Sequence, residues 1–188
     1  MKKSFSISPR ILSHLGEDLI KNESIALLEL VKNSYDACAK KCIVNFVSTN
    51  GKLTKITIKD DGFGMNKETI ENVYLTIGTD FKFKKIEANI CGRIPLGEKG
   101  IGRLGVHKLG NKIILQSRAK NSKEVFLNID WTKLSEAKNI DDFTIDLIEN
   151  DSSDVFKDGT GTQIIIEGLK TNWDKRELRE VYRNLNSL

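Results

Sequence analysis

The order of helix-forming and strand-forming segments is the feature that most constrains the fold of this chain. Glu23-Ser24 opens a stretch with helical periodicity over residues 25–40. Two β-rich runs follow at residues 43–47 and 54–59, and Asn50-Gly51 between them is a strong signal for a tight hairpin turn. Helices that precede hairpin-connected strands predict an α+β fold, in which helices pack on one face of a single sheet.

The remaining segments extend this pattern. Ser8-Pro9 is typical of a helix start, with Ser8 as the N-cap and Pro9 in the first turn. Further strands are expected at residues 113–117, 125–129, 144–148 and 162–167. We expect one main domain over residues 1–170. Residues 171–188 have helical spacing, and they form either an ordinary terminal helix or the start of a following domain.

The composition limits which ligands and which cellular compartment are expected. Thirty basic and 26 acidic side chains leave a net charge of +4, which permits an anionic ligand such as a nucleotide or a nucleic acid but requires neither. No apolar run is long enough to span a bilayer, and the N-terminal residues lack the apolar stretch of a signal peptide. The 3 cysteines favour reduced thiols over a disulfide framework. We therefore expect a cytoplasmic protein without a membrane partner.

A polar face on the second helix offers groups for metal and proton chemistry. Glu29, Asn33 and Asp36 are spaced by one helical turn each, so they share one side of the helix. The amide oxygen of Asn33 can ligate Mg²⁺, and a carboxylate one turn away can take a proton from an attacking water. The alternative is the solvent-exposed face of an ordinary amphipathic helix, which this segment alone does not exclude.

Asp60-Asp61-Gly62-Phe63-Gly64-Met65 follows the second strand of the predicted hairpin. A carboxylate at a strand end can accept a hydrogen bond from the adenine amino group, whereas guanine has a carbonyl at that position. Gly62 and Gly64 allow the backbone to approach the base closely, and Met65 offers a polarizable wall for the ring. Taken alone, the segment also fits a simple turn after a strand.

A second glycine-bearing segment runs over residues 97–105 as Gly-Glu-Lys-Gly-Ile-Gly-Arg-Leu-Gly. Its spacing fits the dinucleotide-binding fingerprint, but that fingerprint needs a strand directly before it, and a loop with Pro95 stands there instead. It is not a Walker A loop, because no Gly-Lys-Ser/Thr is present. Backbone N–H groups of such a loop, together with the cations Lys99 and Arg103, suit phosphate binding.

Together with Gly161-Thr162-Gln163-Ile164, these segments stand in an order that resembles one known family. It is the ATP-binding domain shared by gyrase B, heat-shock chaperone ATPases, histidine kinases and MutL, known as the GHKL or Bergerat fold. The resemblance covers residues 29–164 and implies a two-layer α/β sandwich, with helices packed on one face of a mixed, mostly antiparallel sheet. The second helix looks most similar to chaperone-like or MORC-like bacterial ATPases.

The resemblance implies roles for individual residues. It implies that Glu29 is the general base and that Asn33 ligates Mg²⁺. It implies that the first aspartate of the pair, Asp60, reads the adenine, and that Thr162, or Thr160 in a second register, bonds this aspartate. A lid over about residues 79–96 and the glycine segment would bind the phosphates. The implied nucleotide contacts there are Thr79, Lys82, Gly97, Lys99, Gly100, Ile101, Gly102 and Arg103.

The resulting prediction is Mg²⁺-dependent ATP binding and hydrolysis that drives a conformational or clamp cycle of a larger protein, with slow turnover in the isolated domain. ATP, ADP and Mg²⁺ are the expected ligands, and a nucleotide-dependent homodimer is the expected assembly. Two alternatives stay open: a histidine-kinase-type phosphotransfer module, and a nucleotide-sensing or nucleic-acid-clamping module with negligible turnover. The sequence names neither the pathway nor the client.

Overall fold

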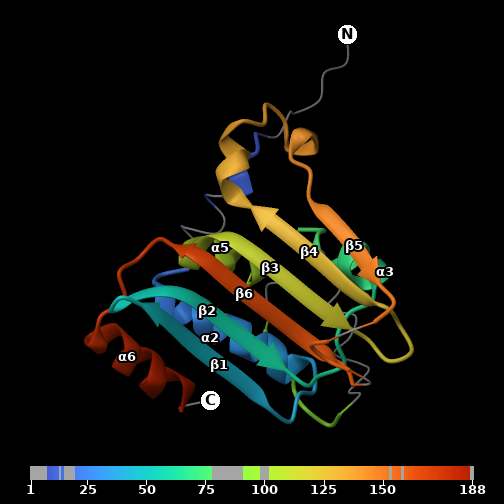
Figure 1. The fold of residues 1–188 in the computed structure, drawn as a ribbon, viewed down its shortest axis with the longest axis horizontal. Coiled ribbons are helices and arrows are strands. Elements are labelled where there is room, and N and C mark those ends of the chain that lie inside the picture. Colours follow the sequence, from blue (N-terminus) through green and yellow to red (C-terminus); the bar gives the residue numbers. More distant parts are fainter. Residues whose placement is uncertain are drawn as a thin grey trace.

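One six-stranded sheet forms the frame of the molecule (Figure 1). The computed structural model describes residues 8–12, 14, 20–77, 91–97, 102–152, 154–157 and 159–186. The strand order is β1-β2-β6-β3-β4-β5, and each pairing between described strands is antiparallel. The strands are β1 (Cys42–Thr49), β2 (Lys52–Asp60), β3 (Gly110–Arg118), β4 (Glu124–Asp130), β5 (Asp146–Asn150) and β6 (Gly161–Leu169).

The longer helices gather on one side of this sheet, which confirms the predicted α+β class (Figure 1). In Figure 1, helix α2 (Glu23–Asp36) lies behind the strands, and α6 (Lys175–Leu185) packs against it. Shorter helical segments complete the chain. They are α3 (Lys67–Thr69), the π-helix η1 (Ile70–Tyr74), the 3₁₀ segments η2 (Gly102–Gly105), η3 (Trp131–Ser135) and η4 (Ile140–Asp142), and α5 (Val106–Leu109).

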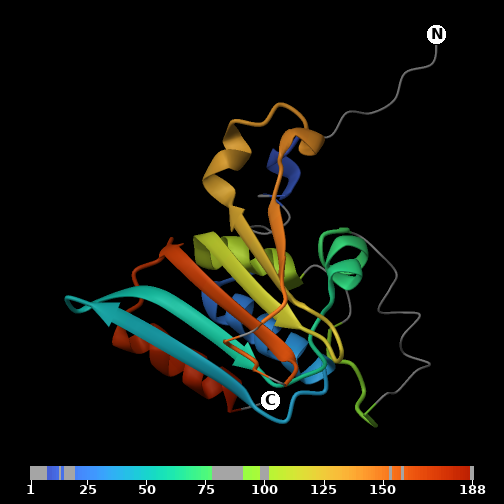
Figure 2. The ribbon, with the colours of Figure 1, turned by 45° about the vertical axis from the view of Figure 1, so that its right-hand side comes forward.

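The helical segment made of α3 and η1 lies on the β4–β5 side of the sheet in both ribbon views (Figure 2). Lys67 at the start of α3 forms an ion pair with Glu149 of β5, with 3.9 Å between the charged atoms. The segment begins at Asn66, whose side chain accepts the backbone N–H of Thr69 at 2.9 Å. This places Tyr74, at the end of η1, next to the glycine segment that contains η2, because Arg103 lies over its ring.

The core lies between α2 and the inner face of the central strands. Ile56 of β2 and Ile113 of β3 both pair with Ile166 of β6, and all three side chains are fully buried. Leu27 and Leu30 of α2 cover them from the helix side. Each fully buried side chain of this size contributes about 1.5–3 kcal/mol relative to an exposed one. The position of α2 is therefore set by packing against the sheet.

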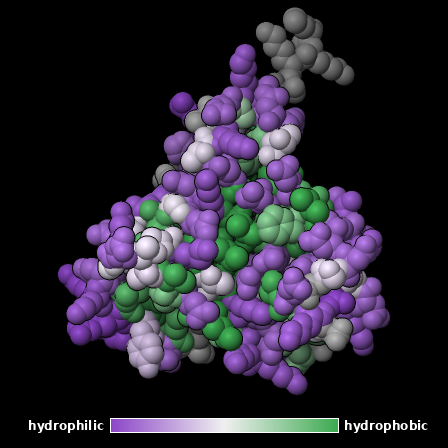
Figure 3. All heavy atoms as spheres, in the orientation of Figure 1, coloured by the Kyte–Doolittle hydropathy of each residue, from purple (hydrophilic) through white to green (hydrophobic). Residues whose placement is uncertain are grey.

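The opposite face of the sheet is exposed in the described part of the chain. Val44 and Phe46 of β1 pack against the core, so the alternating Ile43 and Val47 point to the other side and are exposed. Ile148 on β5 is also 51% exposed. Seen from this side, hydrophobic side chains appear between hydrophilic ones over the strands (Figure 3). The site described below lies on the helix side.

The second helix ends earlier than its periodicity predicts. α2 stops at Asp36 instead of continuing to residue 40. Cys38 just beyond it has a left-handed backbone with φ of +60°, which ends helical hydrogen bonding. The N–H groups of Lys40 and Lys41 donate instead to one carboxylate oxygen of Asp61, at 2.8 Å each. This turn joins the end of α2 to the end of β2.

The cysteines correct one expectation from the sequence. Cys38 and Cys91 form a disulfide across 53 residues, with their Cα atoms 6.1 Å apart, and Cys42 is a free thiol. The expectation of reduced thiols was wrong because it counted cysteines and could not see which of them the fold brings together. Among the described residues, no group of three His, Cys, Asp or Glu side chains could hold a metal ion. No described helix is long and apolar enough to cross a membrane.

Candidate active site

A cavity of about 180 Å³ lies between α2 and the sheet. Most of its wall is apolar, and the polar side chains in it come from elements that are far apart in the sequence. Apolar pockets with a few placed polar groups are the usual form of a small-molecule site. The lining residues are Leu30, Asn33, Ser34, Ala37, Ile58, Asp60, Gly64, Met65, Val73, Tyr74, Arg103, Leu115, Thr162 and Ile164.

Asp60 supplies the buried carboxylate of this cavity. It is the last residue of β2 and is only 7% exposed. Its Oδ2 accepts the hydroxyl of Ser34 at 2.9 Å, and its Oδ1 accepts the N–H groups of Gly62 (3.0 Å) and Thr162 (3.2 Å). Burial raises the pKa of Asp60, and these donors oppose the rise. A carboxylate has about four acceptor positions, so it can take a further N–H from a ligand.

The neighbouring Asp61 has a different role. Successive strand residues point to opposite sides, and Asp61 directly follows β2 on the exposed side. Its carboxylate accepts the N–H groups of Lys41 and Lys40, and the bond from Lys41 is the main reason why its pKa is lowered. Asp61 therefore fastens the turn after α2 and is absent from the cavity wall.

Glycines are required where the loop after β2 passes close to other backbone. Gly64 has φ of +63°, and a Cβ there would lie 2.0 Å from the carbonyl oxygen of Arg118. A Cβ on Gly62 would lie 2.6 Å from the carbonyl oxygen of Ala37. Met65 follows in the cavity wall, and its N–H donates to Ser117 Oγ at 2.8 Å. The loop is thus held against both α2 and β3.

The two candidate threonines occupy different places. Thr162 lines the cavity, donates its backbone N–H to Asp60 and shares a 2.8 Å hydrogen bond between its hydroxyl and that of Ser117. Thr160 instead donates its hydroxyl to the carbonyl of Gly62 at 2.6 Å and is not among the lining residues. The geometry thus brings Thr162, and not Thr160, to the cavity.

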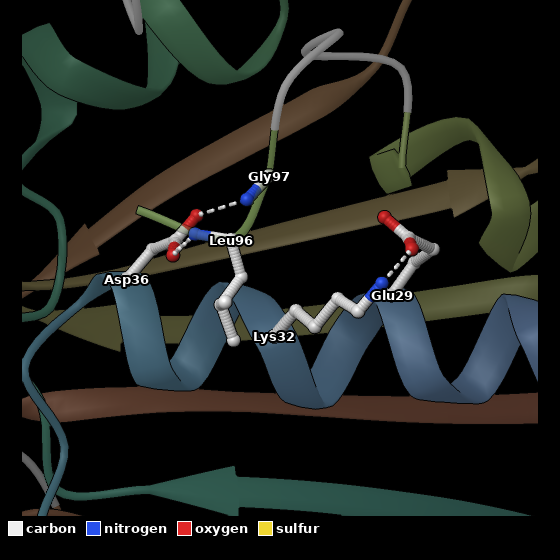
Figure 4. A network of polar contacts seen from close by, with 5 residues as sticks. All are labelled: Glu29, Lys32, Asp36, Leu96 and Gly97. Atoms are coloured by element: carbon white, nitrogen blue, oxygen red, sulfur yellow. Dashed lines mark hydrogen bonds and ion pairs between the residues drawn. The ribbon is translucent and has the colours of Figure 1, made fainter. Parts of the chain in front are cut away.

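The polar face of α2 divides into two parts. Asn33 lines the cavity, whereas Glu29 and Asp36 face the glycine segment (Figure 4). Asp36 accepts the backbone N–H groups of Leu96 (2.7 Å) and Gly97 (3.2 Å). Asp36 therefore holds Gly97 at the start of the glycine segment. Glu29 lies against Gly102, where the described part of this segment resumes.

Glu29 is held on two sides. Its Oε1 accepts the ammonium group of Lys32 at 2.8 Å. On the other side, a Cβ on Gly102 would lie 3.2 Å from Oε2, so the glycine lets η2 approach the carboxylate closely. Its side chain is 28% exposed. A partly buried carboxylate beside a glycine-rich loop and one turn from Asn33 can serve as a proton acceptor.

Arg103 makes contacts that the sequence did not suggest. Its guanidinium donates to the carbonyls of Val73 (2.7 Å) and Thr76 and lies 6.0 Å from the ring centre of Tyr74. Its Nε is buried without a hydrogen-bond partner among the described residues. Burial lowers the pKa of Arg103 and raises the pKa of Tyr74 to about 12. In this structure the arginine ties η2 to η1 at the wall of the cavity.

Several predicted residues lie outside the described part of the chain: Thr79, Lys82, Lys99, Gly100 and Ile101. Other residues of the site were missed at the sequence level. Ser34 and Ser117 hold Asp60 and Met65, and Lys32 holds Glu29. Helical spacing could have indicated Lys32, which is three residues from Glu29. Ser117 lies 52 residues from Met65, and no local pattern indicates it.

Residues 21–162 match the family described as "Histidine kinase-, DNA gyrase B-, and HSP90-like ATPase". The chain belongs to this family. The match spans the cavity from α2 to the start of β6 and confirms the resemblance found in the sequence motifs.

Three curated proteins are similar to parts of this chain. A chaperone protein HtpG of Clostridium acetobutylicum is 27% identical over 190 residues, which cover 92% of this chain and 28% of the relative. A putative type II restriction enzyme, HgiDII of Herpetosiphon aurantiacus, is 37% identical over 106 residues, with 56% and 16% covered. A DNA mismatch repair protein MutL of C. acetobutylicum is 31% identical over 106 residues, also with 56% and 16% covered. The chain therefore spans less than a third of these relatives' length.

Proposed function

We propose that this domain binds ATP with the adenine in the cavity between α2 and the sheet, and hydrolyses it with Glu29 as the general base. The observation that carries the proposal is Asp60, a buried carboxylate at the wall of a mostly apolar cavity. Its three protein donors fix its orientation and leave about one acceptor position for the adenine amino group. Guanine presents a carbonyl there, which a carboxylate repels. Gly64, Met65 and Thr162 supply the surrounding wall.

Mg²⁺ fits the residues beside the cavity. Mg²⁺ keeps several waters and is commonly bound through substrate phosphates with only one or two protein ligands. Asn33 offers one amide oxygen in the cavity wall. The described residues contain no group of three His, Cys, Asp or Glu side chains that could hold a metal ion, so the proposed Mg²⁺ would be held mainly by the nucleotide. The ion would neutralise phosphate charge when bound. Glu29 lies one turn before Asn33, and its carboxylate would take the proton from the attacking water.

The glycine segment is the proposed phosphate site. Gly97 and Gly102 lie against the same helix face as Glu29, and the residues between them would present backbone N–H groups to the phosphates. Lys82 and Lys99 remain the proposed cations, with Thr79, Gly100 and Ile101 as further contacts. Arg103 would add its charge at the cavity wall, from a guanidinium that also holds η1.

Hydrolysis in this domain would drive a conformational or clamp cycle of a larger, homodimeric protein. The support for this is the likeness to a chaperone protein HtpG and a DNA mismatch repair protein MutL, of which the chain covers 28% and 16%. The kinase alternative receives less support, because the Glu29–Asn33 pair provides a base for water rather than an acceptor histidine. His14 is the histidine that precedes the site in sequence.

Calorimetric titration and single-turnover hydrolysis test the proposal together. We expect ATP and ADP to bind, GTP to bind at least tenfold more weakly, and phosphate to be released slowly from Mg²⁺-ATP. A difference of one hydrogen bond with a buried carboxylate, about 1.5–3 kcal/mol, is sufficient for this selectivity. Equal affinity for GTP would contradict the role of Asp60. ATP binding without phosphate release would leave a nucleotide-sensing module, and phosphate transfer to His14 would favour the kinase.

A further inference from the structure

Lys32 and Glu29 form an ion pair at the edge of the site. The hydrolysis proposed above gives Lys32 no role. The Lys32 Nζ lies 2.8 Å from Glu29 Oε1, and the two side chains are 25% and 28% exposed (Figure 4). Both side chains are partly buried, and the short contact fixes where one oxygen of the Glu29 carboxylate lies.

Lys32 has two carboxylates within reach on the helix and pairs with one of them. Lys32 lies three residues after Glu29 and four before Asp36, and both carboxylates are within reach on a helix. The oxygens of Asp36 accept the N–H groups of Leu96 and Gly97. The lysine pairs with Glu29, whose Oε1 it occupies. In this arrangement Asp36 holds the docked segment, and Lys32 holds Glu29.

The same contact leaves a defined oxygen of Glu29 for chemistry. In the described part of the chain, Oε2 accepts no hydrogen bond and lies on the side of Gly102. A glutamate has three side-chain torsions, and an unrestrained one would present either oxygen in many orientations. General bases are commonly oriented by a third group that binds the atom not used in proton transfer.

We propose that Lys32 is a positioning residue that holds Oε1 of Glu29 and so presents Oε2 to the attacking water. The inference rests on the proposed ATP hydrolysis and adds to it a determinant of turnover. Oε2 accepts the proton from water as the water oxygen forms its bond to the γ-phosphorus and the bond from phosphorus to the bridging oxygen breaks. Lys32 contacts neither the water nor the nucleotide in this scheme.

Steady-state kinetics of the Lys32→Met and Lys32→Arg variants test this role, in the complete protein. A misplaced catalytic group can cost up to about 100-fold in rate. We expect Lys32→Met to lower kcat about tenfold with an unchanged KM for Mg²⁺-ATP, and Lys32→Arg to restore most of it. A matched control is Lys55→Met, which removes the 2.9 Å pair between Lys55 and Glu167 on strands β2 and β6. It should leave both constants unchanged.

A double variant separates positioning from a general structural effect. If Lys32 acts through Glu29, the Glu29→Gln/Lys32→Met protein hydrolyses ATP no more slowly than Glu29→Gln alone. Independent, multiplying losses would overturn the inference, as would a Lys32→Met rate equal to wild type. A raised KM with unchanged kcat would instead make Lys32 a phosphate-binding residue and also overturn it. Lys32→Gln repeats the test if the methionine variant is unfolded by circular dichroism.

These outcomes are distinguishable from failure of the proposed function. If the wild-type protein binds ATP but releases no phosphate in single-turnover experiments, the proposed hydrolysis is wrong. The proposed role of Lys32 is then wrong as well. If the wild-type protein hydrolyses ATP and the lysine variants do too at the same rate, only the role of Lys32 is wrong.

Discussion

The backbone N–H of Gly97 donates to Oδ2 of Asp36 at 3.2 Å, although 61 residues separate them. Leu96 donates to the other oxygen at 2.7 Å, so one carboxylate at the end of α2 holds two consecutive amides. Arg93 adds a 2.8 Å bond to the carbonyl of Ala39 and lies 4.8 Å from the ring centre of Tyr35. The approach to the glycine segment is therefore docked on the helix that carries Glu29 and Asn33.

The Cys38–Cys91 disulfide fastens the start of the same docked segment, and its reduction is predicted to loosen it. We expect lower hydrogen-exchange protection at Leu96 and Gly97 in the reduced protein, because Asp36 then holds them without the covalent link. The free energy of unfolding should fall by about 2–4 kcal/mol. Hydrogen-exchange mass spectrometry and urea titration measure the two effects.

Cys42→Ser is the control for reduction, since this free thiol lies outside the disulfide. It should keep the full redox response, and Cys38→Ser/Cys91→Ser should match the reduced wild type under oxidising conditions. Equal exchange at Leu96 in the oxidised and reduced proteins would show that the contacts of Asp36 and Arg93 are sufficient without the link.

Asp60→Asn is predicted to weaken ATP binding by about 1–3 kcal/mol, because it leaves a buried hydrogen bond mispaired. Asp61→Asn is the matched control: the same change one residue later removes a carboxylate that caps the turn after α2 and is absent from the cavity wall. Calorimetry should show near-normal affinity for it. Loss of affinity in Asp61→Asn alone would show that Asp61, and not Asp60, recognises the adenine.

The same two variants should differ in how pH affects stability. Burial raises the pKa of Asp60 above its ordinary 3.8, so its contribution to stability is complete below pH 3.8 and is lost as pH rises through the folded value. The bond from Lys41 lowers the pKa of Asp61, so its contribution is present above pH 3.8 and is lost as pH falls through the folded value.

Urea unfolding between pH 3 and pH 6 therefore has opposite expected trends. Relative to wild type, Asp60→Asn should become more stable as pH rises, and Asp61→Asn should become less stable. Parallel trends for the two variants would mean that the difference in burial between these carboxylates does not control their titration.

Asn33→Ala is predicted to weaken Mg²⁺-ATP binding while sparing ADP measured without metal. The amide oxygen is a weak ligand, and phosphates and waters supply most of the affinity for Mg²⁺, so a loss of about tenfold or less is expected. Titrations with and without EDTA give the comparison. Equal losses for both ligands would indicate damage to α2, whose Leu30 side packs in the core.

Local sequence patterns predicted most of the frame. Asn50-Gly51 forms the expected turn with both residues at positive φ, +52° and +76°, and every predicted strand is present within a few residues of its expected ends. The choice of Asp60 over Asp61 came from the family resemblance, and the alternation of strand residues agrees with it. The turn and the strands depend on residues that are close together in the sequence, and a sequence pattern contains this local information.

Contacts between distant segments were not predictable in the same way. The disulfide joins residues 53 apart, and Arg103 donates to the carbonyls of Val73 and Thr76. A spacing rule can place Arg103 beside a glycine loop, but its direction depends on where η1 packs. The serines that hold Asp60 and Met65 likewise depend on how α2 and β3 meet the loop after β2.

Glu29→Gln decides between an enzyme and a passive nucleotide binder. It preserves the size of the side chain and removes the proton acceptor, and a positioned general base typically contributes about 10²–10⁴ in rate. We expect ATP affinity close to wild type and hydrolysis reduced by that order, with an ATP-bound dimer accumulating in the complete protein. The comparison belongs in the complete protein, because the proposed homodimer would bring a second copy to the site. Unchanged hydrolysis in this variant would remove Glu29 from the reaction and would favour the kinase or sensing alternatives.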